Sequence, residues 1–112
     1  MEVLKSINTD KRDIVKASVA VETVQEHANE TVVLTGIIIA KKWSDDEQRD
    51  VEVTALKLQN GTFITSISKT VKDSAETMLN AFEENEFANG LEIVIKSKKS
   101  KGGRDFFYLD LA

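Results

Sequence analysis

The chain has 112 residues, of which 41% are hydrophobic and 30% are charged, and its formal net charge is −4. This length and balance fit a folded protein with one hydrophobic core, and they argue against disorder. The absence of cysteine and the single histidine exclude disulfide frameworks, thiolate nucleophiles and the usual zinc sites. We therefore expect a single domain over residues 1–112 that holds no metal and no cofactor.

The N-terminal part of the chain gives weak signals, and we expect residues 1–30 to form a helical or irregular segment. A short helix from Asp10 to Ala17 is expected, with Thr9 as its N-cap and acidic residues near the positive end of the helix dipole. A second short helix is expected from Val21 to Ala28. The core is expected to lie within Thr31–Leu111.

A strand-like pattern begins at Thr31. Residues 31–43 are rich in Val, Ile and Thr and apolar on both faces, and Gly36 in their middle predicts a bent first strand. After a polar turn, alternation over Arg49–Leu58 predicts a second strand. Asn60-Gly61 is a strong hairpin signal, so a third strand is expected over Thr62–Ser68.

The period then becomes helical, and Ser68 or Thr70 could cap an amphipathic helix whose apolar residues are Val71, Ala75, Met78, Leu79 and Phe82. Alternation returns over Leu91–Lys96, and a last strand over Arg104–Leu111 follows a basic loop that ends in glycine. Three strands, one helix and two strands is the element order of the OB-fold, a five-stranded Greek-key barrel. We expect a mainly β protein with helices, with an OB barrel over residues 31–112. An open α+β sheet of the same element order is the alternative.

Catalytic groups are scarce in this sequence. His27 lies beside Glu26 and Glu30, where a lone histidine is usually a solvated surface residue and not a general base. The acidic stretch at 45–47 lacks the spacing and the glycine of an EF-hand loop, which favours a solvated hairpin tip. The glycines at 102–103 precede no helix that would present amides to a phosphate. We predict no catalytic residue and no metal site, and we expect that the protein is not an enzyme.

The charges are distributed unevenly along the chain. Residues 71–90 hold one base against five acids, whereas residues 91–112 hold five bases against three acids. A net-acidic protein can bind a polyanion when its basic groups lie on one face. The alternative is that the lysines only keep a small domain soluble.

The last predicted strand carries three consecutive aromatic residues. Because side chains alternate along a strand, Phe107, Leu109 and Leu111 should face the core. Phe106 and Tyr108 should then face outward. Exposed rings beside lysine and arginine hold bases and phosphates together in proteins that bind single strands. A second hydrophobic seam against the N-terminal segment is the structural alternative for these two rings.

The candidate nucleic-acid-binding residues are therefore aromatic rings and the basic residues near them. Trp43 follows two lysines at the end of the first strand, where a tryptophan is more often exposed than buried. Phe63 comes directly after the predicted hairpin turn. The full set comprises Lys41, Lys42, Trp43, Lys57, Phe63, Lys96, Lys98, Lys99, Lys101, Arg104, Phe106 and Tyr108.

Three segments add a resemblance to a known family: the strand Val33–Ile39, the hairpin Asn60–Phe63 and the closing segment Lys101–Tyr108. Together they resemble the small OB-fold single-stranded DNA-binding proteins that phages of Gram-positive bacteria encode. The resemblance extends from Val32 to Leu111. It implies a protein that coats transient single strands of DNA during replication or recombination, with little sequence preference.

Single-stranded DNA is thus the leading partner, and proteins of replication or recombination would be further partners. An RNA-binding OB domain is an alternative, since recognition of the 2′-hydroxyl leaves no readable mark here. A protein-interaction or assembly subunit that buries Phe106 and Tyr108 against another chain is a third. A free strand edge would also allow a homodimer. The longest apolar run, Val32–Ala40, is too short to span a bilayer, so we expect no membrane partner and a cytoplasmic location, in the host cell for a phage protein.

Overall fold

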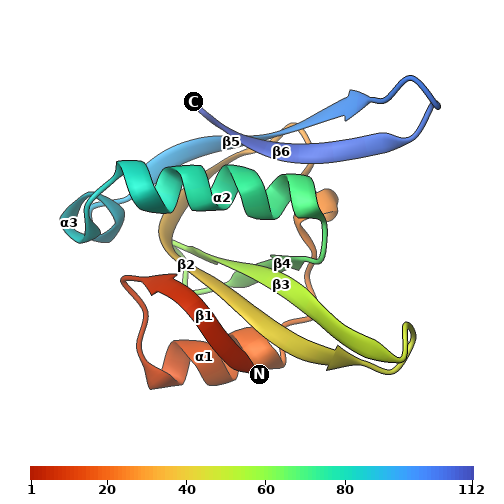
Figure 1. Ribbon diagram of the computed structural model, residues 1–112. Helices are drawn as coiled ribbons and strands as arrows, with labels where there is room; N and C mark the ends of the chain where they lie inside the picture. Colours follow the sequence, from red (N-terminus) through yellow and green to blue (C-terminus); the bar gives the residue numbers. More distant parts are fainter.

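The computed structural model describes residues 1–112 and shows a mainly β protein whose six strands form one antiparallel sheet (Figure 1). The strands are β1 (Glu2–Ile7), β2 (Thr31–Ser44), β3 (Arg49–Leu58), β4 (Phe63–Ser66), β5 (Leu91–Lys99) and β6 (Asp105–Leu111). The helices are α1 (Lys11–Ser18), the 3₁₀-helix η1 (Val24–His27), α2 (Lys69–Ala81) and α3 (Glu84–Ala88). From β2 onward the expected strands and helix occur in the expected order, with α3 added before β5.

Strand β2 is long, and it pairs with three other strands. It pairs with β3 along one edge, and along the other with β5 through residues 31–34 and with β1 through residues 37–41. A bulge between Leu34 and Gly36 marks the change of partner. A Cβ at Gly36 would lie 3.0 Å from the carbonyl oxygens of Ile7 and Asn8. Glycine is therefore needed where the chain leaving β1 passes close to β2.

The sheet has the strand order β4-β3-β2-β5-β6, and no ladder joins β4 to β6. The segment before β2 connects the two sides instead. Thr65 N in β4 donates to Glu22 O, and Asn29 N donates to the carbonyl oxygen of Ile95 in β5. Val24 of η1, which lies between these contacts, is 1% exposed and belongs to the main core. The core thus extends beyond the expected Thr31–Leu111.

The N-terminal segment holds more regular structure than expected. The sequence pattern does not reveal β1, because most of its side chains are exposed and it forms by pairing with β2. The N-cap of α1 is Asp10 and not Thr9, since Asp10 Oδ1 accepts a hydrogen bond from Asp13 N at 2.9 Å. The helix expected over Val21–Ala28 is only the short η1.

Two hydrophobic clusters lie on opposite faces of β2. Helix α2 runs across the sheet (Figure 1) and buries one apolar stripe in the larger cluster, with Val71, Ala75 and Met78. Helix α1 covers the smaller cluster, which contains Ala17 and Phe63. None of the helices combines the length and the apolar character that a membrane crossing needs.

Candidate nucleic-acid interface

The β5–β6 hairpin brings four of the candidate residues onto one face. Lys96 lies opposite Tyr108 in the ladder, and Lys98 lies opposite Phe106. Directly opposed residues of an antiparallel pair point to the same side of the sheet. We call the surface formed by Lys96, Lys98, Phe106 and Tyr108 the hairpin face. It places two ammonium groups beside two aromatic rings.

The two rings of the hairpin face lie next to each other. The ring centroids of Phe106 and Tyr108 are 6.4 Å apart, and the ring planes are inclined by 37°. Neither ring belongs to a core cluster, whereas Leu109 is buried and Phe107 packs against the main core. The expected alternation of β6 is therefore confirmed for these four residues. Leu111 departs from it, because its side chain is 50% exposed at the strand end.

The end of β5 and the turn that follows it are basic. Lys98, Lys99, Lys101 and Arg104 are exposed, and none of them takes part in an ion pair. We call these four residues the basic tip. The tip extends away from the rest of the protein in Figure 1. Its cations are therefore free to meet an anionic partner.

Lys96, at the other end of the hairpin face, already has a carboxylate partner. Its Nζ lies 2.8 Å from Asp110 Oδ2. The hydrogen bond from Lys96 lowers the pKa of Asp110, and the same contact raises the pKa of Lys96. Lys96 is thus charged, but Asp110 offsets much of its attraction for a phosphate.

A second group of candidates lies on the β2–β3 hairpin, apart from the first. The ring of Trp43 is 55% exposed, and its Nε1 donates to Asp45 Oδ1 at 3.0 Å. Lys42 Nζ donates to Ser18 O in α1, and Lys41 lies opposite Glu52. The two hairpins project toward the same side in Figure 1, with the β2–β3 turn acidic and the β5–β6 turn basic.

Two candidates serve the fold. Phe63 is only 4% exposed, because α1 packs over it together with Ala17. Lys57 Nζ forms an ion pair of 3.0 Å with Asp13 Oδ2, which ties α1 to β3. Phe63 therefore has no exposed ring on which a base could stack, and the ammonium group of Lys57 already has a carboxylate partner.

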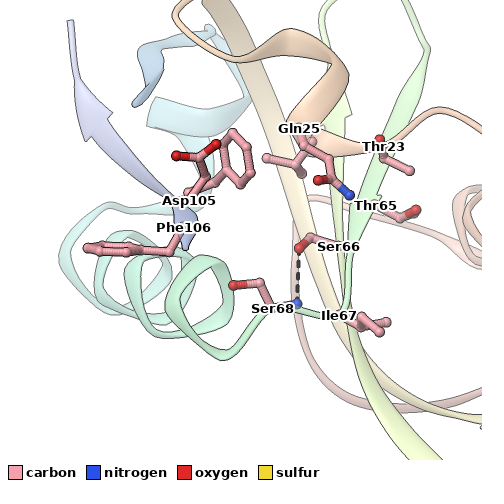
Figure 2. A pocket seen from close by; sticks show the side chains of 10 residues that line it. Thr23, Gln25, Thr65, Ser66, Ile67, Ser68, Asp105 and Phe106 are labelled. Carbon is pink, nitrogen blue, oxygen red and sulfur yellow. Dashed lines mark hydrogen bonds between the residues drawn. The ribbon is translucent and has the colours of Figure 1, made fainter. Parts of the chain in front are cut away.

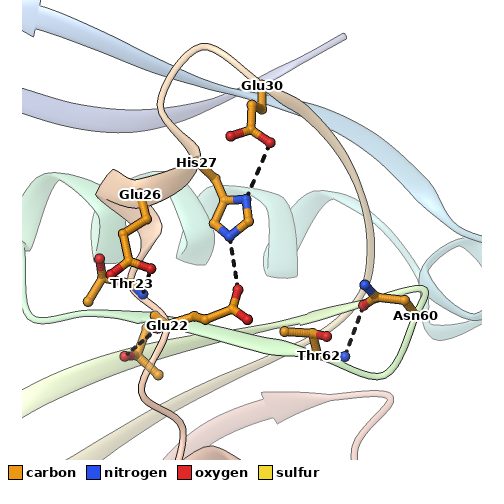
Figure 3. Close-up of polar contacts among 8 residues, drawn as sticks. Glu22, Thr23, Glu26, His27, Glu30, Asn60 and Thr62 are labelled. Atoms are coloured by element: carbon orange, nitrogen blue, oxygen red, sulfur yellow. Dashed lines mark hydrogen bonds and ion pairs between the residues drawn. The ribbon is translucent and has the colours of Figure 1, made fainter.

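His27 is held between two carboxylates and is not the solvated residue expected (Figure 3). Its Nε2 lies 3.1 Å from Glu22 Oε2, and its Nδ1 lies 3.4 Å from Glu30 Oε1. The hydrogen bond with Glu22, followed by that with Glu30, raises the pKa of His27. These contacts hold together the two ends of residues 22–30, the segment before β2 that bridges β4 and β5 in space.

The chain was also compared with known proteins. A family model described as phage single-stranded DNA-binding protein matches residues 20–112. The match includes η1 and every element from β2 to β6. No curated protein and no solved structure matches the chain.

Proposed function

The chain belongs to the phage single-stranded DNA-binding protein family and binds single-stranded DNA, and we propose that the DNA lies on the hairpin face and the basic tip of the β5–β6 hairpin. Bases stack on Phe106 and Tyr108, whose rings are adjacent. Phosphates contact the free cations of the basic tip. The observation that carries this proposal is the opposition of Lys98 and Phe106 in the ladder, because it brings charge and ring to one surface.

This chemistry favours binding without sequence preference. Stacking accepts any base, and phosphate contacts carry no sequence information. The proposed role is to coat single strands that are exposed transiently during replication or recombination. A DNA strand that is bound on one side only stays accessible on its other side to proteins of replication or recombination.

The strand pairing supports an OB-like interpretation of the fold. Strands β2 to β6 with α2 follow the OB element order, and β1, α1, η1 and α3 would be additions to it. OB-folds bind oligonucleotides on the face of strands two and three, which are β3 and β4 here, and through the loops that join strands one to two and four to five. These loops correspond here to the turns of the β2–β3 and β5–β6 hairpins.

The correspondence assigns a second contact to the β2–β3 hairpin. Trp43 would stack there, with Lys41 and Lys42 beside it. Trp43 is the only tryptophan, so its fluorescence reports this contact alone. We expect oligo-dT to quench it. A fluorescence that stays constant while the oligonucleotide binds would restrict the site to the β5–β6 hairpin.

The proposal is tested by competition at low salt. A labelled oligo-dT is bound by the protein and then challenged with unlabelled oligo-dT, with duplex DNA and with oligo-rU. We expect the duplex to compete poorly, because its paired bases are stacked on one another and cannot reach the rings. Equal competition by duplex and single strand would contradict stacking on Phe106 and Tyr108. Equal competition by oligo-rU would show that the site also accepts RNA.

A further inference from the structure

A cavity of about 350 Å³ lies where the edge strands β4 and β6 do not pair (Figure 2). It is at the lower end of the range for small-molecule sites. Its walls come from three parts of the chain, which are η1 with the residue before it, the end of β4 with the cap of α2, and the start of β6. The lining residues are Thr23, Val24, Gln25, Thr65, Ser66, Ile67, Ser68, Asp105, Phe106 and Phe107.

The polar groups of this cavity are mostly neutral. No lysine or arginine lines it, and Asp105 is its only charged residue, so a phosphate would be repelled. Gln25 reaches from η1 toward Ser66 in Figure 2. The residues that line the cavity form one hydrogen bond among the atoms drawn, which Ser68 N donates to Ser66 Oγ. The Gln25 amide, with two donors and an acceptor, therefore has no partner among them.

The cavity is continuous with the proposed path of the DNA. Asp105 and Phe106 belong both to its lining and to the hairpin that carries the basic tip. The Phe106 ring points away from Ser66 and Ser68 in Figure 2. The next residue, Phe107, has its side chain on the opposite side of β6 and is only partly buried. A DNA strand that passes around Asp105 at the start of β6 would therefore have the Phe106 ring on one side of β6 and the cavity, with its aromatic wall and neutral polar groups, on the other.

We propose that this cavity binds one nucleobase of the single strand, with Gln25 donating to or accepting from the edge of that base. The inference rests on the proposed function, since the β5–β6 hairpin must hold the DNA. An amide and hydroxyls can both donate and accept, so they fit the edges of all four bases. The cavity therefore holds a base without selecting it, which suits a protein that coats any sequence.

Gln25→Glu should give the cavity a preference for cytosine over thymine. A carboxylate only accepts, so it favours the amino group of cytosine over the O4 oxygen of thymine. We expect the ratio of oligo-dC affinity to oligo-dT affinity to rise by about two- to tenfold over that of the wild type, the size of one hydrogen bond. The matched control is Gln59→Glu, which adds the same charge to an exposed glutamine in the β3–β4 turn and should leave the ratio unchanged.

Gln25→Leu removes the amide and keeps a side chain of similar size. We expect it to weaken oligo-dT binding by about two- to tenfold and to leave binding of an abasic sugar-phosphate oligomer unchanged. Gln25 is exposed, so melting temperatures should match the wild type. The proposal that the cavity binds a base would be overturned by either of two results. One is an unchanged ratio of oligo-dC to oligo-dT affinity in Gln25→Glu, and the other is an equal loss of affinity for oligo-dT and for the abasic oligomer in Gln25→Leu. Wild-type affinity for oligo-dT in the variants with alanine at the hairpin face or the basic tip would instead overturn the proposed DNA path.

Discussion

Lys98 lies directly opposite Phe106 across the β5–β6 ladder, so a cation and an aromatic ring share one surface. The ring of Phe106 is in turn adjacent to that of Tyr108. The end of β5 and the turn that follows it hold the basic tip, in which no cation forms an ion pair with a carboxylate. A single hairpin therefore offers both interactions that a single strand of DNA needs.

Replacing Lys98, Lys99 and Lys101 together by alanine should weaken binding of oligo-dT and reduce its dependence on salt. Each phosphate contact contributes a slope of about 0.7 in log affinity against log salt concentration, so the slope should become shallower by up to about 2. Affinities measured over a series of NaCl concentrations give this slope.

A matched control for that variant replaces Lys11, Arg12 and Lys16 of α1 by alanine. These residues are exposed, lie in no ion pair and carry the same total charge. We expect the control to keep the wild-type slope. Equal slopes for both triple variants would remove the basic tip from the site.

Phe106→Ala and Tyr108→Ala should each weaken binding by about 1–3 kcal/mol, the usual contribution of a ring that stacks on a base. Because both rings are only half-buried, the free energy of unfolding should fall by about 1 kcal/mol or less. Phe63→Ala is the contrasting variant, and it should lose about 3–5 kcal/mol of stability while its folded fraction binds normally. Denaturant melts and oligo-dT titrations on the three variants separate stacking from packing. Destabilisation by all three with no loss of affinity would rule out the aromatic platform.

Much of the sheet follows from the sequence, because its strands alternate between a buried and an exposed face. The bounds of β3 and the direction of Phe106 and Tyr108 can be derived in this way. The burial of Phe63 cannot, since it depends on α1 packing over the sheet. Lys57 likewise meets Asp13 from a distant part of the chain. Local patterns carry no signal for such contacts.

Strand β1 cannot be predicted locally for the same reason, and neither can the place of η1 in the core. Most side chains of β1 are exposed, so its sequence shows no clean alternation. The role of η1 depends on Val24, a single apolar residue that fills the core between β4 and β5. The cavity beside it arises because β4 and β6 do not pair, which is a property of the whole sheet.

Val24→Ala should lower the free energy of unfolding by about 2 kcal/mol, because it removes buried methyl groups and leaves a cavity. Val21→Ala is its control. The Val21 side chain is 87% exposed, so its loss should change stability by no more than about 0.5 kcal/mol. Chemical denaturation of both variants tests whether the N-terminal segment belongs to the cooperative unit. Equal stability of the two variants would show that it does not.

Stability should also depend on the charge of His27. Glu22 and Glu30 raise its pKa in the folded state, so the protonated form stabilises the fold. This contribution is complete below the unfolded pKa of about 6.5, and it is lost as pH rises through the raised folded pKa. We expect a loss of up to about 1 kcal/mol, typical of a partly exposed ion pair.

The control for this effect is His27→Gln, which cannot titrate. Denaturant melts of both proteins from about pH 5.5 to about pH 8.5 cover the transition. The wild type should lose stability toward the alkaline end, and the variant should show a flatter profile. Parallel curves would mean that other groups determine the pH dependence.

The path of the DNA is tested most directly by an NMR titration of the isotope-labelled protein with oligo-dT. The account predicts that the largest amide shifts occur between Lys96 and Tyr108, on the hairpin face and the basic tip. The amides of α3, far from that hairpin tip in Figure 1, should stay unchanged. Large shifts elsewhere in the protein, with the β5–β6 hairpin unaffected, would contradict the proposed interface.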